Sequence, residues 1–203
     1  MNILLLGPPG AGKGTQGAIL AKRLGLPKFA TGDLIRDAIA AGTPLGTQAK
    51  AIYDSGALVG DDLIMGIVRE ELAKPVANKG AILDGVVRTI PQAEGVARLL
   101  AEHGRKIDAV LFFDVADREI LSRIAKRRTI EGRTDDDPLA VQRRLAAYRT
   151  QTAPVLAWYE ARGGVTTIPG TGSVEEIADR VKSALGQMAM DNRQWAPGPY
   201  KGQ

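Results

Sequence analysis

The most informative part of the chain is a glycine-rich run near its start, Gly7-Pro8-Pro9-Gly10-Ala11-Gly12-Lys13-Gly14-Thr15. It follows an apolar run, Asn2–Leu6, and opens a segment, Gly12–Leu24, with apolar residues at helical spacing. A glycine-rich turn between a buried strand and a helix points successive backbone N–H groups inward, and the helix dipole adds a favourable field for an anion. The stretch therefore predicts a phosphate-binding loop at the first strand–helix junction.

Lys13 supplies the mobile positive charge of this loop and is predicted to reach the β- and γ-phosphates of a bound nucleotide. The commonest pattern places Ser or Thr directly after the lysine, whereas here Gly14 precedes Thr15. The Thr15 hydroxyl is still expected near the phosphates or a bound Mg²⁺. The alternative is a glycine-rich turn with a surface lysine, which the strand and helix on either side disfavour.

Elsewhere in the chain, short apolar runs without polar alternation indicate strands that are buried on both faces of a parallel sheet. Segments of helical length separate these runs, which predicts an α/β fold. The predicted strands are Ile3–Leu6, Lys28–Ala30, Ala81–Leu83, Ala109–Phe113 and Val165–Ile168. The predicted helices are Gly12–Leu24, Ile90–Glu102, Arg118–Arg128 and Val174–Leu185.

Two insertions interrupt the strand–helix alternation. Residues 31–74 are predicted to be helical, with helix starts at Thr31 and Thr43-Pro44 and stops at Gly42 and Gly56, so this stretch forms an arm. The second insertion is a polar loop, Arg127–Asp137, which caps a long helix from about Leu139 to Ala161. The polar tail 191–203 is rich in Pro and Gly and is predicted to be disordered.

Length and composition indicate one soluble domain. The chain has 203 residues and a formal net charge of +4, which suits anionic small molecules or nucleic acid as partners without choosing between them. It has no cysteine, so disulfides and thiolate zinc sites are excluded. Its first apolar run is too short for a signal peptide or a membrane span.

Several motifs occur together at a spacing that resembles adenylate kinase, of the nucleoside monophosphate kinase family. The resemblance covers the chain to about Gly186. Its motifs are the Gly-x-Pro-Gly-x-Gly-Lys-Gly-Thr loop, Thr31-Gly32-Asp33 with Arg36, Leu83-Asp84-Gly85 with Arg88-Thr89 and Gln92-Ala93, Gly132-Arg133-x-Asp135-Asp136, and Arg143-Arg144-Leu145.

The resemblance implies a P-loop three-layer fold with a five-stranded parallel sheet and a single domain over residues 1–190. The core would comprise residues 1–29, 60–126 and 138–190, with an arm at 30–59 that closes over the monophosphate and a lid at 127–137 that closes over ATP. It implies the reversible reaction of ATP with AMP to give two ADP, with Mg²⁺. A cytoplasmic monomer engaged in purine nucleotide homeostasis, with no nucleic-acid or membrane partner, is expected.

The resemblance also assigns the site residues. The ATP phosphate cradle would be Gly10, Ala11, Gly12, Lys13, Gly14 and Thr15, with Arg127 on ATP and the Gly172 backbone on its adenine. The AMP pocket would be Thr31, Arg36, Ala57, Leu58, Val59, Gly85, Val86, Val87, Arg88 and Gln92, with Arg133 and Arg144 bridging the phosphates. The catalytic set would be Lys13, Arg88, Arg127, Arg133 and Arg144.

Elementary chemistry agrees with these assignments, because phosphoryl transfer needs positive charge arranged around a loose transition state. The arginines of the site are expected at loops or helix ends, where planar guanidinium groups converge on phosphate oxygens. Asp84 is expected to hold Mg²⁺ through water, or else to be a turn aspartate. Gln92 is expected to read an adenine edge, or else to face solvent. Arg123 is expected to pair with Asp135–Asp137.

The chain departs from the family pattern at Val86-Val87, where adenylate kinases usually carry Phe-Pro. A Val–Val bond is expected to be trans, because a cis bond there costs about 2.5–4 kcal/mol. A weaker or reshaped AMP site follows from this departure. The lid resembles the short type and lacks four metal-ligand positions, so no zinc and no protein-bound metal is expected.

Two rival functions remain open from the sequence. A kinase of UMP or CMP would use the same loop and arginines, although Thr31 and Gln92 favour adenine. A non-catalytic nucleotide- or nucleic-acid-binding module would need no second set of arginines.

Overall fold

A single five-stranded parallel sheet organises the chain, with strand order β2-β3-β1-β4-β5. The computed structural model describes residues 1–40, 42, 44–55 and 59–190. All five predicted strands are present, and so is the predicted α/β class. The strands are β1 Asn2–Leu6, β2 Lys28–Ala30, β3 Ala81–Asp84, β4 Ala109–Asp114 and β5 Val165–Pro169.

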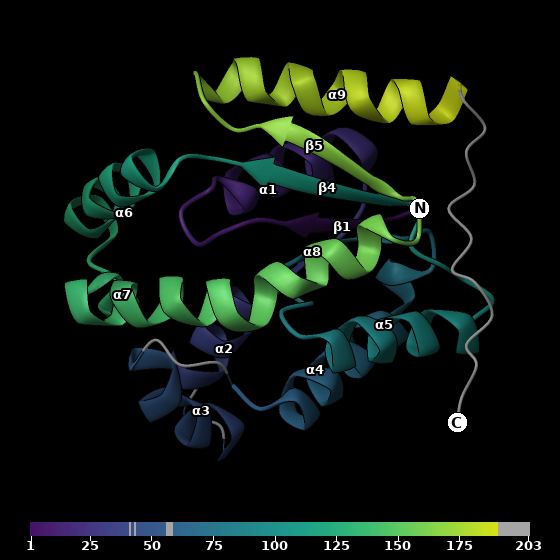
Figure 1. The fold of residues 1–203 in the computed structure, drawn as a ribbon. Helices are drawn as coiled ribbons and strands as arrows, with labels where there is room; N and C mark the ends of the chain where they lie inside the picture. The colour runs from purple at the N-terminus through teal and green to yellow at the C-terminus, as the bar shows by residue number, and fades with distance from the viewer. Residues whose placement is uncertain (41, 43, 56–58, 191–203) are drawn as a thin grey trace.

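Helices cover both faces of the sheet (Figure 1). Successive side chains of β1 point to opposite faces and pack against different helices. Ile3 and Leu5 pack with α1 Lys13–Leu24 and α9 Val174–Met190 on one face. Leu4 and Leu6 pack with α4 Asp61–Ala73, α5 Ile90–Glu102 and α8 Ala153–Glu160 on the other. Because both faces are covered, Ile3–Leu6 of β1 is apolar at every position, as is typical of a strand buried in a parallel sheet.

The arm consists of short helices, as the sequence predicts. Thr31 is the first residue of α2 Thr31–Ala40, and α3 Pro44–Asp54 and α4 follow. Gly42 lies in the turn between α2 and α3 and has φ 63°. Thr43 and Gly56 fall outside the described residues.

The predicted polar loop Arg127–Asp137 is wrong in its first half. The helix α6 Asp117–Glu131 continues through Thr129 and Ile130, because no Gly or Pro interrupts it before Gly132. Gly132 ends the helix with φ 61° and donates its N–H to the Arg128 carbonyl. A single 3₁₀ turn, η2 Thr134–Asp136, completes the segment.

The predicted long helix after the lid is divided in two. The helix α7 Pro138–Ala147 passes through a π-helical turn, η3 Tyr148–Thr152, into α8. Pro154, within the first turn of α8, lacks an N–H and cannot make the regular i to i−4 bond, which accounts for the wider turn.

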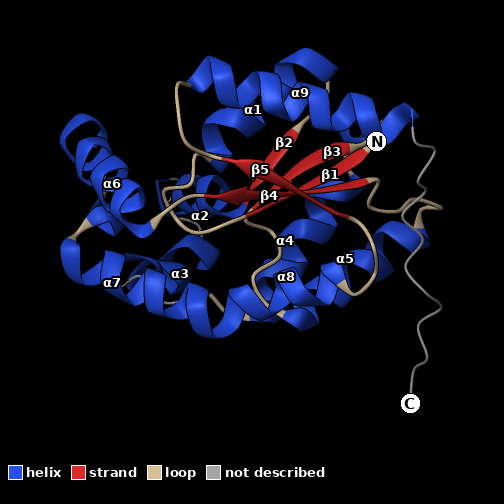
Figure 2. Cartoon of the chain, turned by 45° about the horizontal axis from the view of Figure 1, so that its top comes forward, coloured by secondary structure: helices blue, strands red, loops and turns tan. Residues whose placement is uncertain are grey.

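The carboxyl ends of the strands lie at one edge of the sheet, and the helices α6 and α7 and the arm helices α2 and α3 lie beyond that edge (Figures 1 and 2). The chain order reverses at β1, which pairs with β3 on one side and β4 on the other. A crevice at such a reversal is where open α/β sheets bind ligands. Within the described ranges, no helix has the length and apolarity needed to traverse a bilayer.

Candidate active site

The glycine-rich loop turns sharply between β1 and α1. Gly7, Gly10 and Gly12 have φ values of 140°, 81° and 92°. A β-carbon at Gly7 would lie 2.8 Å from the Phe113 carbonyl oxygen, and one at Gly10 would lie 2.9 Å from the Ile124 side chain. The loop thus needs glycine both for its backbone angles and for its close contact with β4 and α6.

Lys13 at the start of α1 folds back over this loop. Its ammonium donates hydrogen bonds to the carbonyls of Gly7 at 2.7 Å and Pro8 at 2.8 Å. Burial is the main cause that lowers the pKa of Lys13 to about 8; the charge of Asp84 opposes the shift and the nearby arginines add to it. Burial disfavours the charged ammonium, and a phosphate bound next to it would stabilise that charge. The lysine is therefore suited to bind an anion.

The loop forms one wall of a cleft of about 860 Å³. The cleft brings together residues that the sequence assigns to both nucleotides. Those that line it are Gly10, Gly12, Lys13, Gly14, Thr15, Arg36, Gly85, Val87, Arg88, Arg127, Arg133, Arg144 and Gly172. The assigned residues Ala11, Thr31, Val59, Val86 and Gln92 are buried behind its wall. Ala57 and Leu58 fall outside the described residues.

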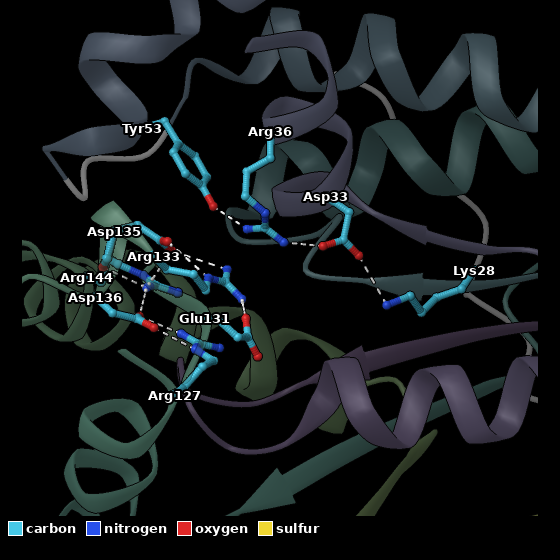
Figure 3. A network of polar contacts seen from close by, with 10 residues as sticks. All are labelled: Lys28, Asp33, Arg36, Tyr53, Arg127, Glu131, Arg133, Asp135, Asp136 and Arg144. Carbon is cyan, nitrogen blue, oxygen red and sulfur yellow. Dashed lines mark hydrogen bonds and ion pairs between the residues drawn. The ribbon is translucent and has the colours of Figure 1, made fainter. Parts of the chain in front are cut away.

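Two buried aspartates hold Arg127, Arg133 and Arg144 (Figure 3). Arg127 forms a bidentate pair with Asp136, with N···O distances of 2.7 and 2.6 Å. Arg144 donates to Asp135 at 2.8 Å and to Asp136 at 3.2 Å, and Arg133 donates to Asp135 at 3.2 Å. Both aspartates are almost fully buried, at 3% and 2% exposure. The carboxylates therefore fix three guanidinium groups at the cleft wall before any ligand arrives.

The pKa shifts reflect this packing of like charges. Burial lowers the pKa of Arg88 and of Arg144, and their mutual repulsion adds to the effect at Arg88. Burial alone would raise the pKa of Asp135, but the positive charges of Arg144 and Arg133 hold it below its usual value. The cleft is thus a place where negative charge is stabilised.

Two expectations about the arginines are wrong. Arg123 pairs with Glu119 at 2.8 Å and donates to the Gly170 carbonyl at 2.7 Å, so it makes none of the expected contacts with Asp135–Asp137. That role belongs to Arg127, one turn further along α6.

Arg36 and Arg127 also lie within helices α2 and α6 instead of at loops or helix ends, because a long side chain reaches the cleft from a helix face.

Hydrogen bonds tie Thr31 and Arg88 to the end of β3. Thr31 Oγ1 donates to the Gly85 carbonyl at 2.9 Å, and Arg88 Nε donates to the same oxygen at 3.1 Å. Arg36 pairs with Asp33 and donates to the Tyr53 hydroxyl. These bonds orient the two arginines toward one region of the cleft.

Gln92 is buried, so the alternative of a solvent-facing glutamine is wrong. Its amide oxygen accepts from the Arg88 N–H at 2.7 Å, and its amide nitrogen donates to Asp61 at 2.8 Å. The glutamine therefore fixes the backbone at Arg88. Contact with an adenine edge stays a prediction.

Asp84 ends β3 and lines the cleft beside the loop. Its carboxylate lies 3.6 Å from the position that a β-carbon on Gly14 would occupy. Its negative charge also opposes the lowering of the Lys13 pKa. An oxygen donor at this place fits Mg²⁺ bound through water, since this ion prefers a few carboxylates together with phosphate and water. Among the described residues, no cluster of three His, Cys, Asp or Glu side chains is suited to a metal ion.

Val86 and Val87 are both buried, and Val87 lines the cleft wall. The bond between them is trans, as expected, since the described chain contains no cis peptide bond. Its effect on AMP stays a prediction.

Several residues that shape the site were missed, or only partly predicted, from the sequence. Asp135 and Asp136 were expected to pair with an arginine, but with Arg123 and not with their actual partners Arg127, Arg133 and Arg144. Asp61 starts α4 and looks like an ordinary acidic residue of a first turn. Tyr53 carries no sequence signal, since a tyrosine in a helix is usually a packing residue.

A phosphate loop at the carboxyl edge of a parallel sheet, facing arginines from an arm and a lid across one cleft, defines a nucleotide-dependent phosphotransferase. Comparison with known proteins identifies the family. The adenylate kinase family model matches residues 5–164. The chain is therefore a member of the adenylate kinase family, an enzyme of the nucleoside monophosphate kinase class.

Curated adenylate kinases resemble the chain along nearly its whole length. The one from Gemmatimonas aurantiaca is 48% identical, covering 91% of this chain and 99% of the relative. The one from Thermus thermophilus is 46% identical, covering 91% and 96%. The one from Xanthomonas oryzae is 44% identical, covering 92% and 100%.

Proposed function

We propose that the chain transfers the terminal phosphoryl group of Mg²⁺-bound ATP reversibly to AMP, giving two ADP, and so contributes to purine nucleotide homeostasis. The observation that supports this most is the single cleft, with the Lys13 loop on one wall and a separate arginine set on the other. A protein that only bound one nucleotide would need one such set. Two opposed sets suit a donor and an acceptor.

On the donor side, backbone N–H groups of Gly10, Ala11, Gly12, Lys13, Gly14 and Thr15 surround the phosphates of ATP. Arg127 contacts these phosphates from the lid. The backbone at Gly172, where φ is 106° and a β-carbon would lie 2.3 Å from Glu176, contacts the adenine. Asp84 would hold Mg²⁺ through water, and the ion would neutralise charge on the β- and γ-phosphates.

On the acceptor side, Arg36 and Arg88 bind the phosphate of AMP. Thr31, Gly85 and Gln92 form the adenosine pocket with Ala57, Leu58, Val59, Val86 and Val87. The hydrogen bonds among Thr31, Gly85 and Arg88 support this role, because they fix both the pocket wall and the guanidinium.

In the transfer, an oxygen of the AMP phosphate forms a bond to the γ-phosphorus of ATP while the bond to the β–γ bridging oxygen breaks. Lys13, Arg88, Arg127, Arg133 and Arg144 stabilise the negative charge that is spread over the transferred group. Their fixed positions reduce the reorganisation needed at this step. The arm 30–59 and the lid 127–137 close over the core (1–29, 60–126 and 138–190) and exclude water, which would otherwise hydrolyse ATP.

We further propose that the enzyme acts as a cytoplasmic monomer. Its partners are ATP and AMP, without nucleic acid, membrane or zinc.

The proposal is tested by mixing the purified protein with ATP, Mg²⁺ and each of AMP, UMP and CMP, and measuring ADP. We expect ADP chiefly with AMP, and a loss of at least about 10²-fold in kcat for Lys13→Met. Lys22→Met, on the exposed part of the same helix, is the matched control and should keep the parent rate. Preferred turnover of UMP or CMP would favour the first rival, and ATP binding without ADP would favour a binding module.

A further inference from the structure

Tyr53 lies where the arm meets the lid, at the end of α3. Its hydroxyl accepts a hydrogen bond from Arg36, and its ring lies 5.9 Å from the Arg36 guanidinium carbon. The tyrosine is partly buried and lines the cleft. Figure 3 shows it reaching from the arm toward the lid arginines.

The same hydroxyl lies near the lid. Burial would lower the pKa of Arg133, but hydrogen bonds and charge from Asp135, with a polar interaction from Tyr53, raise it. The helix α3 contacts the lid turn η2 directly, and Arg143 donates to the Ser55 carbonyl across the same boundary at 3.4 Å. The Tyr53 hydroxyl, which is hydrogen-bonded to Arg36 of the arm, therefore lies close to Arg133 of the lid.

The arginines beside Tyr53 determine which way its O–H group points. Arginine only donates hydrogen bonds, so the Tyr53 oxygen is the acceptor in its bond with Arg36. Within the described part of the chain, its proton goes to no acceptor, and it remains available to a ligand in the cleft. Arg88 and Arg144 line the same cleft, and Tyr53 contributes to the electrostatic environment of both. A group bound there would be anionic.

We propose that Tyr53 is a further acceptor-site residue, whose hydroxyl aligns Arg36 of the arm with Arg133 of the lid and donates its proton to a phosphate oxygen of the acceptor. The inference rests on the proposed function for the identity of that phosphate. The bridge itself links the arm and the lid in the enzyme without nucleotide.

Tyr53→Phe removes the hydroxyl and keeps the ring with its contact to Arg36. We expect the KM for AMP to rise about tenfold, as for loss of a hydrogen bond to a charged group, and kcat to fall, while the KM for ATP stays within about twofold. Tyr159→Phe, which removes a hydroxyl from the buried face of α8, is the matched control and should leave the KM for AMP unchanged. A purely packing role for Tyr53 would leave all three constants at parent values and overturn the proposal.

A second readout does not depend on turnover. The chain has no cysteine, so Ala51→Cys on the arm and Thr129→Cys on the lid can carry spin labels, and their separation can be measured in the nucleotide-free enzyme. We expect Tyr53→Phe to lengthen and broaden the distance distribution, and an unchanged distribution would overturn the bridge. If the parent made no ADP from AMP, the proposed function would fail, while the distance measurement would still test Tyr53.

Discussion

The lowered pKa of Lys13 predicts a pH dependence that separates free from nucleotide-bound enzyme. Its pKa is reduced from 10.5 to about 8 by burial and by the neighbouring arginines. In the free enzyme, the ammonium is thus about nine-tenths protonated at pH 7 and about one-tenth protonated at pH 9. Bound phosphate favours the charged form, which raises the pKa of the lysine by about 1–3 units in the complex with ATP.

Two kinetic constants should therefore respond differently. Above pH 8, kcat/KM for ATP should fall by about tenfold per pH unit, because it reports the free enzyme. Over the same range, kcat should stay nearly constant to about pH 9, because it reports the bound complex. Initial rates from pH 6.5 to 9.5, at saturating AMP and varied ATP, give both profiles.

Lys13→Arg identifies the group responsible. Arginine stays protonated throughout this range, so the alkaline decrease in kcat/KM should be absent from that variant even if its rates are lower. A parent profile that stays level to pH 9.5 would refute the explanation, and so would the same decrease in Lys13→Arg.

Two further predictions concern the acceptor pocket and the lid. Val87→Pro should lower the KM for AMP by about two- to fivefold, with ATP binding near normal, because the proline ring fixes φ at this position of the pocket and less backbone freedom is lost when AMP binds. Equal steady-state values in parent and variant would refute this. Asp136→Asn removes the carboxylate partner of Arg127, whereas Arg144 keeps Asp135, so the variant should destabilise the fold by about 3–5 kcal/mol and lower kcat by about 10²-fold. The half-exposed cap variant Asp137→Asn should do neither. Thermal unfolding of Asp136→Asn within about 1 °C of the parent would contradict this prediction.

The fold was predictable because its signals are local. Apolar runs such as Ala109–Phe113 identify buried strands, and the loop from Gly7 to Thr15 identifies the strand–helix junction. The end of α6 was less predictable, because a polar helix and a polar loop have similar composition until Gly132 ends the helix.

The partners within the site were harder to predict than its members. The arginines were recognisable by motif, but Arg127 and Arg123 lie four residues apart on one helix, and only the packing decides which of them meets Asp136. The role of Tyr53 depends on the approach of α3 to η2, a contact between segments about eighty residues apart that no spacing in the sequence encodes.

The charge of the cleft bears on the reversibility of the proposed reaction. Among the described residues that line it, nine are Lys or Arg and five are Asp or Glu, so an excess of positive charge faces the ligands. Transfer of a phosphoryl group from ATP to AMP moves negative charge from one wall to the other but leaves the total unchanged, because two ADP molecules carry the same number of phosphates. A fixed set of cations that spans both walls therefore stabilises reactants and products alike. Such a set concentrates its effect on the transition state between them, where the moving group lies within reach of Lys13 from one side and the arginines from the other.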